Sequence, residues 1–345
     1  MKAIQITKFV DSFSELGVRE IPPPRPDADH EVVVKISHSA LNHVDLLYAR
    51  GRHQNNHIGL VKPPFVLGLE FAGVVVSAPL KSASTSKSGF NFKPGDKVWG
   101  ASVGGFAEQI AVPASALQRL PTGWTLHDAA GLGAATAPVS YGALVRVAQL
   151  QAGQTVLVHA AAGGLGVVAV QIAHALGANV IATVGSDEKA QVVRQLGVLA
   201  VVRYDLDGWE KQVWDITGRT GVHVVYDTVG LVEKSLRCLT FGGCIVVAGF
   251  AGRGGNMETL AMNRVLLKGA RLLGYRYGET GRQNPEENEA VWKGLNDLLE
   301  TGRVRPIVYK TYLGLESVPG AMDDLAARKV WGKAIVEIRS PTPNL

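Results

Sequence analysis

The sequence is poor in cysteine and has no long apolar run. Its 345 residues contain 2 cysteines, Cys238 and Cys244, too few for a disulfide scaffold or for a metal site of four thiolates. Redox chemistry would therefore have to come from a bound cofactor. No stretch approaches the ~18 consecutive apolar residues of a membrane helix, and residues 1–9 alternate like a strand and lack the features of a secretory signal. We expect a cytoplasmic protein that does not bind membranes.

The sequence also has no segment in which charges of one sign are concentrated. Lys and Arg number 35 and Asp and Glu number 30, which gives a formal net charge of +5. The excess is spread thinly along the chain, with no arginine-rich run or basic stripe, so we expect no nucleic-acid partner. Part of the positive charge can instead serve a small anionic ligand.

Two patterns of secondary structure follow one another along the chain. Residues 1–125 consist of short β-branched runs, such as 31–37 and 73–77, broken by the Pro-rich stretch 21–26 and the polar segment 81–89. This part is expected to be all-β. From about residue 154, apolar strands alternate with amphipathic helices. The expected strands are 155–159, 179–183, 199–204, 222–226 and 244–250, and the expected helices are 166–176, 187–196, 209–217 and 231–239.

This alternation predicts an α/β fold with a doubly wound parallel sheet of the Rossmann type. A last helix is expected at 286–300, and strand character returns at 304–309 and 333–338. The simplest architecture inserts a nucleotide-binding domain, residues 127–275, into a mostly β catalytic domain formed by residues 1–126 and 276–345.

A glycine-rich turn joins the strand at 155–159 to the following helix. Ala161, Gly163 and Gly166 occupy the glycine positions of the G-x-G-x-x-G pattern. Glycines there let backbone N–H groups approach a pyrophosphate at a helix N-terminus. Because strand, turn, helix and a further βαβ array all follow, the pattern predicts a dinucleotide site. The alternative is a glycine-rich turn that binds nothing.

The second strand indicates which dinucleotide binds. An NAD-preferring fold has an acid about 20 residues beyond the glycines, whereas residues 182–186 read Ala-Thr-Val-Gly-Ser. Ser186, Lys189 and Tyr204 can converge beside the adenosine ribose and bind a 2′-phosphate, which favours NADPH. The alternatives are that Ser186 is only the N-cap of the next helix and Lys189 only a solvated helix residue.

Motifs over nearly the whole chain resemble those of the zinc-independent medium-chain reductases of the quinone oxidoreductase (zeta-crystallin-like) family. They are Leu-Asn-His-Val-Asp-Leu-Leu at 41–47, Pro-Pro-Phe-Val-Leu-Gly-Leu-Glu-Phe-Ala-Gly at 63–73, Lys-Pro-Gly-Asp-Lys-Val at 93–98, Gly-Gly-Phe-Ala-Glu at 104–108, the glycine turn, Val-Tyr-Asp-Thr-Val-Gly at 225–230 and Gly-Lys at 332–333. The resemblance implies a GroES-like catalytic domain, NADPH as cofactor, a quinone or an α,β-unsaturated carbonyl compound as substrate, and a homodimer.

The resemblance also implies roles for individual residues. The pyrophosphate would contact Gly163, Gly164, Leu165 and Gly166. The 2′-phosphate would contact Lys189, Tyr204 and Arg328. Contacts near the nicotinamide would come from Asn42, Thr136 and Phe250.

The metal ligands of zinc-dependent relatives are missing from this sequence. Those proteins need a cysteine near position 42 and a Gly-His-Glu motif, where this chain has Asn42 and Gly-Leu-Glu at 68–70. Without a thiolate or imidazole there, a tetrahedral site cannot form, so we expect no metal. His53 and His57 are spaced i, i+4, but glycines and asparagines surround them and argue for a loop.

Three residues are candidates for catalysis: Asn42, His53 and Thr136. Hydride transfer to an enone or quinone builds negative charge on the carbonyl oxygen, where a donor is worth on the order of 3 kcal/mol. Asn42 and Thr136 would orient the substrate or the nicotinamide. His53, where relatives often have a tyrosine, is either a proton donor or a solvent-exposed loop residue. Asp45 is interpreted as fixing the Asn42 turn rather than acting as an acid.

The expected function is zinc-independent hydride transfer from NADPH to quinones or α,β-unsaturated carbonyl compounds. One alternative is a pathway-specific enoyl reductase of biosynthesis. Another is a non-catalytic NADPH-binding protein.

Overall fold

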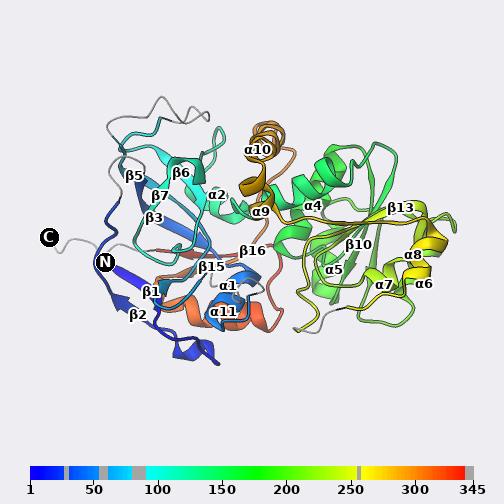
Figure 1. Ribbon diagram of the computed structural model, residues 1–345, viewed down its shortest axis with the longest axis horizontal. Coiled ribbons are helices and arrows are strands. Elements are labelled where there is room, and N and C mark those ends of the chain that lie inside the picture. Colours follow the sequence, from blue (N-terminus) through cyan, green and yellow to red (C-terminus); the bar gives the residue numbers. More distant parts are fainter. Residues whose placement is uncertain (27–30, 54–60, 80–90, 255–257, 339–345) are drawn as a thin grey trace. The chain divides into compact units, whose positions relative to one another are not determined.

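The computed structural model describes residues 1–26, 31–53, 61–79, 91–254 and 258–338. The chain forms two compact units (Figure 1): unit 1 is Met1–Ala135 with Pro306–Leu345, and unit 2 is Thr136–Arg305. The predicted domain division at 126/127 and 275/276 stays a prediction, and the compact units divide at 135/136 and 305/306. His57 and the polar segment 81–89 lie outside the described residues.

Unit 1 is built on a 7-stranded sheet in the order β15-β16-β3-β5-β6-β8, with β7 also paired to β3. All its pairings are antiparallel except β15 with β16. A 3-stranded sheet has the order β2-β1-β4. The strands are β1 (Lys2–Ile6), β2 (Val18–Glu20), β3 (Glu31–Ala40), β4 (Phe65–Val66), β5 (Glu70–Ser77), β6 (Lys97–Ala101), β7 (Gln109–Pro113), β8 (Leu117–Arg119), β15 (Val308–Leu313) and β16 (Lys333–Glu337).

Helices complete unit 1: η1 (Phe13–Glu15), α1 (His43–Ala49), η3 (Ala114–Ala116), α2 (Leu126–Leu132), η5 (Leu315–Ser317) and α11 (Val318–Ala326). The expectation of an all-β first segment is wrong at α1. This helix forms because Asn42 and Asp45 make a capping box at its start, and Leu46 and Ala49 are buried on its inner face. The strand expected at 304–309 begins later, at Val308.

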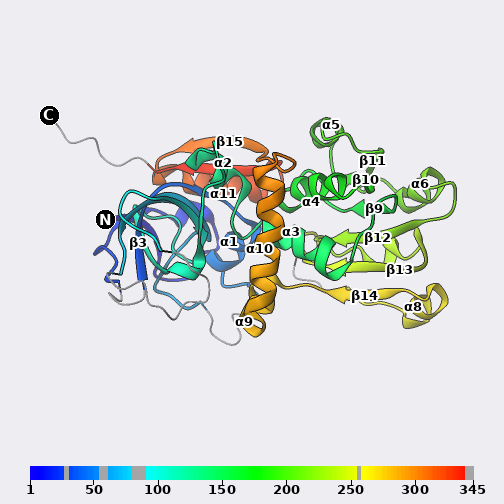
Figure 2. The ribbon, with the colours of Figure 1, turned by 90° about the horizontal axis from the view of Figure 1, so that it is seen from above.

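Unit 2 contains a 6-stranded sheet in the order β11-β10-β9-β12-β13-β14, and every pairing in it is parallel. In order of appearance along the chain this is 3-2-1-4-5-6, the doubly wound order. The predicted fold class is therefore confirmed. The strands, visible in Figure 2, are β9 (Thr155–Val158), β10 (Asn179–Val184), β11 (Ala200–Arg203), β12 (Val222–Asp227), β13 (Leu239–Val247) and β14 (Arg271–Gly274).

The helices of unit 2 are α3 (Ala137–Tyr141), the π-helix η4 (Gly142–Val147), α4 (Gly164–Ala175), α5 (Asp187–Arg194), α6 (Trp209–Ile216), α7 (Val232–Ser235), α8 (Met262–Lys268), α9 (Tyr277–Gln283) and α10 (Pro285–Glu300). Each expected helix is present, although α7 is shorter than 231–239 because β13 starts earlier than residue 244. The sixth strand, β14, was not predicted. Among the described residues, no helix is both long enough and apolar enough to cross a membrane.

The core of unit 2 explains why the alternation of apolar strands and helices could be recognised in the sequence. The central strands β9 and β12 are buried on both faces, so they consist of apolar runs rather than alternating residues. Two of their side chains, Leu157 and Val225, join Trp209 and Val213 of α6 in one apolar cluster. This core therefore holds the carboxyl ends of β9 and β10 in place, and the glycine turn begins at the end of β9.

Candidate active site

The glycine turn brings helix α4 against the end of β9. An ideal Cβ on Gly166 would lie 2.4 Å from the Ala160 carbonyl oxygen, so a side chain there has no room. Ala160 itself has a positive φ of 48°, and the N–H of Gly163 donates to its carbonyl oxygen at 2.8 Å. The turn is therefore as tight as the sequence predicted.

The start of α4 suits a pyrophosphate. Gly163 is the N-cap and offers no side chain to the first N–H groups of this 12-residue helix. Those groups, on Gly164, Leu165 and Gly166, have no acceptor within the helix and carry the positive end of its dipole. The residues present thus fit the dinucleotide expected from the sequence, and their contacts with it stay a prediction.

A buried histidine that the sequence analysis missed supports this turn. His159 follows β9 and is 0% exposed. Its Nδ1 lies 2.8 Å from Thr183 Oγ1 and its Nε2 lies 2.8 Å from Ser235 Oγ. Ser235 Oγ donates to the Leu231 carbonyl oxygen, so Nε2 carries the proton and Nδ1 accepts from Thr183. Burial lowers the pKa of His159, which keeps it neutral. Its only sequence signal is a polar residue at the end of an apolar strand.

Asp227 organises the neighbouring edge at the end of β12. Its buried carboxylate accepts from the backbone N–H groups of Val229, Gly230 and Leu231 at 2.7, 2.9 and 2.7 Å. Gly230 has a φ of 94°, and the Cδ1 atom of Phe250 lies 3.5 Å from the Cβ position of this glycine. Phe250, expected near the nicotinamide, is therefore half-buried against this carboxylate-centred turn.

The residues expected around the 2′-phosphate lie at the ends of two paired strands. Val184 of β10 pairs with Arg203 of β11, so the segments that leave these strands are neighbours. Ser186 Oγ accepts the N–H of Lys189 at 3.3 Å, which makes Ser186 the N-cap of α5. The Tyr204 hydroxyl lies 3.3 Å from the Cβ position of Gly185. The structure thus brings Ser186, Lys189 and Tyr204 together, and their phosphate role stays a prediction.

In unit 1, Asn42 is the N-cap of α1. Its backbone N–H donates to Asp45 Oδ2 at 2.7 Å, which confirms that Asp45 fixes the Asn42 turn. Asp45 is 0% exposed. Burial raises the pKa of Asp45 to about 7, while the bond from Asn42 opposes that shift.

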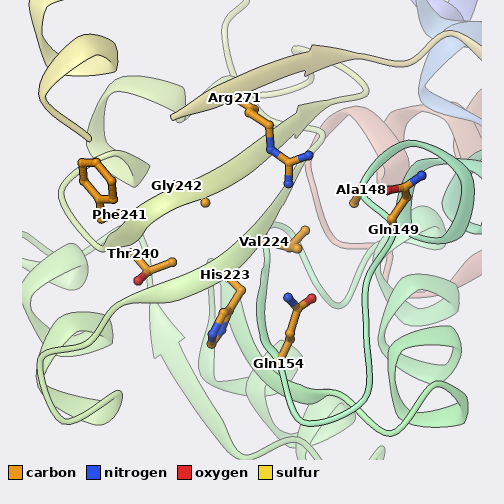
Figure 3. Close-up of a pocket in the computed structure, with 10 residues that line it drawn as sticks. Ala148, Gln149, Gln154, His223, Val224, Thr240, Phe241, Gly242 and Arg271 are labelled. Atoms are coloured by element: carbon orange, nitrogen blue, oxygen red, sulfur yellow. The ribbon is translucent and has the colours of Figure 1, made fainter. Parts of the chain in front are cut away.

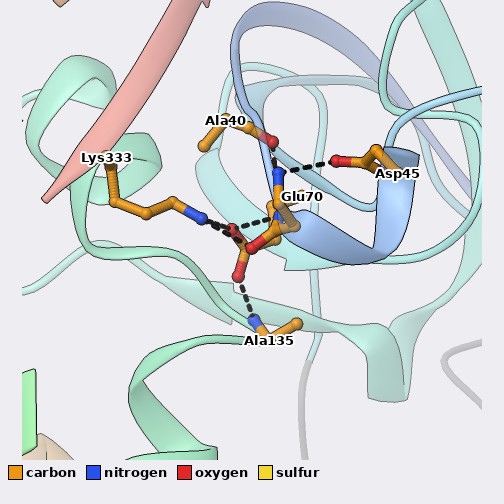
Figure 4. A network of polar contacts seen from close by, with 6 residues as sticks. Ala40, Asp45, Glu70, Ala135 and Lys333 are labelled. Carbon is orange, nitrogen blue, oxygen red and sulfur yellow. Dashed lines mark hydrogen bonds and ion pairs between the residues drawn. The ribbon is translucent and has the colours of Figure 1, made fainter. Parts of the chain in front are cut away.

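The Asn42 side chain belongs to a buried polar network (Figure 4). Lys333 Nζ lies 2.6 Å from Glu70 Oε2 and donates to Asn42 Oδ1 at 2.7 Å. Asn42 Nδ2 donates to Glu70 Oε2 at 2.9 Å, and the Ala135 N–H donates to Glu70 Oε1 at 2.7 Å. Glu70 and Lys333 are 0% and 3% exposed.

Glu70 and Lys333 were not among the predicted site residues. The signal that could have found them is a charged residue directly before an apolar run at the start of each of two strands, β5 and β16. Ala135 directly precedes Thr136, which is buried and is the N-cap of α3. The role of Thr136 near the nicotinamide stays a prediction.

His53 and Arg328 also lie in unit 1. The His53 ring is half-buried in the loop after α1 and sits 4.6 Å from the Tyr48 ring, centroid to centroid. Arg328 is exposed after α11 with a φ of 58°. The proton-donor role of His53 and the phosphate role of Arg328 stay predictions.

The positions that hold zinc in zinc-dependent relatives are filled differently here. Asn42 bonds to Glu70 and Lys333, and position 69 is a leucine. Over the part of the chain that the structure describes, no group of three or more His, Cys, Asp or Glu side chains could hold a metal ion.

A separate cavity of about 170 Å³ opens at the other end of the unit 2 sheet (Figure 3). Its walls come from the amino ends of β12, β13 and β14 and from the segments before β9. Polar members include Gln149, Gln154, His223, Thr240 and Arg271. None of the predicted site residues lines it.

Comparisons with known proteins agree with this geometry. The family model "Alcohol dehydrogenase GroES-like domain" matches residues 28–122, and "Zinc-binding dehydrogenase" matches residues 164–297. The chain is 35% identical to Quinone oxidoreductase-like protein 2 of Bos taurus, covering 94% of this chain and 89% of that protein. It is 31% identical to Quinone oxidoreductase of Pseudomonas aeruginosa, covering 93% and 95%.

Solved structures give the same result. A probable oxidoreductase from Mycobacterium abscessus has a TM-score of 0.82 at 34% identity and covers 98% of each chain. Escherichia coli quinone oxidoreductase complexed with NADPH has a TM-score of 0.83 at 26% identity, covering 98% of this chain and 100% of that one. CurK enoyl reductase, at 22% identity and a TM-score of 0.85, shows the fold alone.

Proposed function

Since this chain belongs to the zinc-independent quinone oxidoreductase family of medium-chain dehydrogenases/reductases, we propose that it is an NADPH-dependent reductase of quinones or α,β-unsaturated carbonyl compounds. The observation that carries the proposal is the tight turn at Gly166, which opens a helix N-terminus beside β10. The absence of an acid at the end of β10 favours NADPH over NADH. The NADPH bound to the E. coli enzyme supports the same choice.

Each candidate residue then has a defined task. Gly163, Gly164, Leu165 and Gly166 would hold the pyrophosphate with backbone N–H groups. Ser186, Lys189, Tyr204 and Arg328 would hold the 2′-phosphate. Bound NADPH would supply the hydride. Asn42, Thr136 and Phe250 would orient the nicotinamide and the substrate, and His53 would deliver the proton.

The direct test is NADPH oxidation, followed by absorbance, with simple quinones and simple enones as acceptors. Turnover of either class supports the proposal. Turnover of enones with little activity on quinones would favour a dedicated enoyl reductase. Tight NADPH binding without turnover of any acceptor would contradict the proposal and favour a non-catalytic binding protein.

Cofactor choice is tested by Lys189→Ala and Arg328→Ala. Each removes one charge-assisted contact, so the Kd for NADPH should rise about ten- to a hundredfold while the Kd for NADH changes little. Lys293→Ala, an exposed lysine on α10, is the matched control and should change neither. Equal losses for both cofactors would remove the phosphate role.

We further propose that the enzyme is a homodimer that joins through the β14 edge of unit 2. Among the described residues β14 pairs with β13 alone, so its outer edge offers unpaired backbone groups. Beside it, Leu266 and Leu267 of α8 are 79% and 74% exposed. Phe241 of β13 is 79% exposed and lies against the Gly269 cap of α8. An apolar patch next to an open edge suits a two-fold contact.

Sedimentation tests the dimer. Leu266→Glu with Leu267→Glu should convert a wild-type dimer into a monomer at micromolar concentration. Leu199→Glu, at an exposed leucine beside β11 on the opposite edge, should leave the dimer intact. A monomeric wild type would contradict the proposal.

We also propose that the protein acts in the cytoplasm, which cell fractionation would test.

A further inference from the structure

We propose that Glu70 and Lys333 are positioning residues that fix which way the side-chain amide of Asn42 points. The proposal rests on the proposed function in one respect: it assumes that Asn42 contacts the nicotinamide or the substrate. It goes further by assigning a task to two buried charges, Glu70 and Lys333.

The chemistry of the neighbours determines the amide orientation. Lys333 Nζ can only donate, and it lies 2.7 Å from Asn42 Oδ1. The acceptors Glu70 Oε2 and the Ala40 carbonyl oxygen lie 2.9 and 3.3 Å from Asn42 Nδ2. Rotating the amide by half a turn would place Nδ2 against the ammonium group and Oδ1 against two acceptors. The pair of charges therefore selects one orientation.

This orientation decides what Asn42 can offer a ligand. Both hydrogens of Nδ2 already point to Glu70 and Ala40. This amide therefore has no N–H left for the nicotinamide or the substrate. In this orientation Asn42 is not suited to donate to a developing oxyanion.

Glu70 also restrains the segment that leads to Thr136. Its Oε1 accepts the N–H of Ala135, the residue just before Thr136, at 2.7 Å. Both carboxylate oxygens lie 2.5 Å from the Cβ position of Gly133, whose φ is 85°. The carboxylate therefore occupies the space that a side chain at position 133 would need. Glu70 thus hydrogen-bonds both to the Asn42 side chain and to the backbone just before Thr136, a second candidate catalytic residue.

A purely structural role explains these charges less well. Taking an ion pair out of water is costly, and neutral replacements of buried pairs are often as stable as the pair itself. A pair kept only for stability would therefore be replaceable by a neutral pair without loss of activity. A pair kept to orient Asn42 would not.

The test uses Glu70→Gln, Lys333→Met and the double variant Glu70→Gln/Lys333→Met. The amide introduced by Glu70→Gln would keep the bond from Ala135 through its oxygen and turn its NH₂ toward Asn42 Nδ2 and Lys333 Nζ. Asn42 Nδ2 would then lose its carboxylate acceptor, and its amide would no longer be held in one orientation. We expect kcat to fall about ten- to a hundredfold in each variant, as small misplacements of catalytic groups do. The Kd for NADPH should change by less than about threefold, because the phosphate contacts are untouched.

The double variant separates positioning from folding. It has no buried net charge at this pair, so its unfolding midpoint should return toward that of wild type while kcat stays low. Adding Glu70→Gln to Asn42→Ala should lower kcat no further. Recovery of both stability and kcat in the double variant, or a full additional loss in the Asn42→Ala background, would overturn the proposal. Lys97→Met, an exposed lysine on β6, is the control and should behave as wild type.

A second readout does not depend on activity. In the cofactor-free protein, the two side-chain amide hydrogens of Asn42 should exchange slowly with water, because both are hydrogen-bonded and Glu70, which accepts one of them, is buried. Glu70→Gln should make them exchange at least about tenfold faster, and unchanged exchange would contradict the proposal. If wild type turns over no acceptor, the proposed function fails, while this measurement still tests the positioning by Glu70 and Lys333.

Discussion

Arg203 donates from Nη1 to Asp187 Oδ1 at 2.7 Å, and its Nε and Nη2 bond to the two carboxylate oxygens of Asp205 at 2.7 and 2.6 Å. These bonds hold two acids beside Ser186 and Tyr204, at the proposed site of the 2′-phosphate. A free carboxylate there would repel that phosphate. Arg203 therefore keeps the neighbourhood open to an anion.

Arg203→Gln should accordingly weaken the binding of NADPH more than the binding of NADH. We expect the Kd for NADPH to rise about five- to tenfold at low salt, since the two released carboxylates repel the phosphate at short range. The difference should shrink as salt is added, because exposed charges are screened. Fluorescence titrations with both cofactors measure it. Arg237→Gln, which breaks the exposed pair with Glu210, is the control, and an equal loss of both cofactors would contradict the prediction.

The fold was predictable where local pattern carries the information. Apolar strands alternate with helices from β9 to β13, and buried parallel strands are apolar throughout, so periodicity found five of the six strands in this sheet. The exception is β14, where Arg271-Leu-Leu-Gly274 is too short to stand out. Helix α1 was missed because its start depends on the capping box of Asn42 and Asp45 rather than on an apolar stripe.

The site was predictable only in part, for a similar reason. The glycine turn and the residues Ser186 and Lys189 are close in sequence, and their spacing carries their geometry. Glu70 and Lys333 are 263 residues apart, so no local pattern pairs them. They come together because β5 and β16 lie on either side of β3 in the folded sheet.

The glycine turn can be tested by two alanine substitutions in the same motif. An alanine Cβ at position 166 would lie 2.4 Å from the Ala160 carbonyl oxygen, whereas at position 163 it would lie 3.3 Å from that oxygen. Gly166→Ala should therefore lower the free energy of unfolding by about 1–3 kcal/mol and weaken NADPH at least about tenfold. Gly163→Ala should cost under about 1 kcal/mol. Urea unfolding compares them, and equal stability losses would contradict the steric argument.

His159 should make the protein sensitive to mild acid. Burial lowers the pKa of this histidine below its usual 6.5, so below that pH the unfolded chain binds more protons than the folded one. Stability is then complete above pH 6.5 and is lost as the pH falls below it. His159→Gln keeps one acceptor and one donor without a titrating ring. Urea unfolding at pH 5.5 and 7.5 should show a smaller pH dependence in the variant than in wild type, and identical slopes would argue against a neutral buried ring.

Asp45 should have the opposite pH dependence, because burial raises its pKa to about 7 from its usual 3.8. Between those values the folded state binds more protons than the unfolded one, so this residue's contribution to stability falls as the pH rises from about 4 to 7 and is constant above. Its Oδ1 is buried with no hydrogen-bond partner among the described residues, so ionisation places a buried charge near Glu70 that the Asn42 N–H and the Lys333 charge offset only in part. Asp45→Asn retains an oxygen for the Asn42 N–H and cannot ionise.

The stability of Asp45→Asn relative to wild type should therefore increase by on the order of 2 kcal/mol between pH 5 and pH 8. In wild type, kcat/KM should decline above pH 7 as the new charge disturbs the Asn42 network, and the variant should lose that decline. Urea unfolding and pH–rate profiles measure the two effects, with Asp207→Asn, at an exposed acid in unit 2, as the control. A variant whose profile and stability follow wild type at every pH would show that Asp45 is already ionised at pH 5, so that the capping bond and Lys333 outweigh its burial.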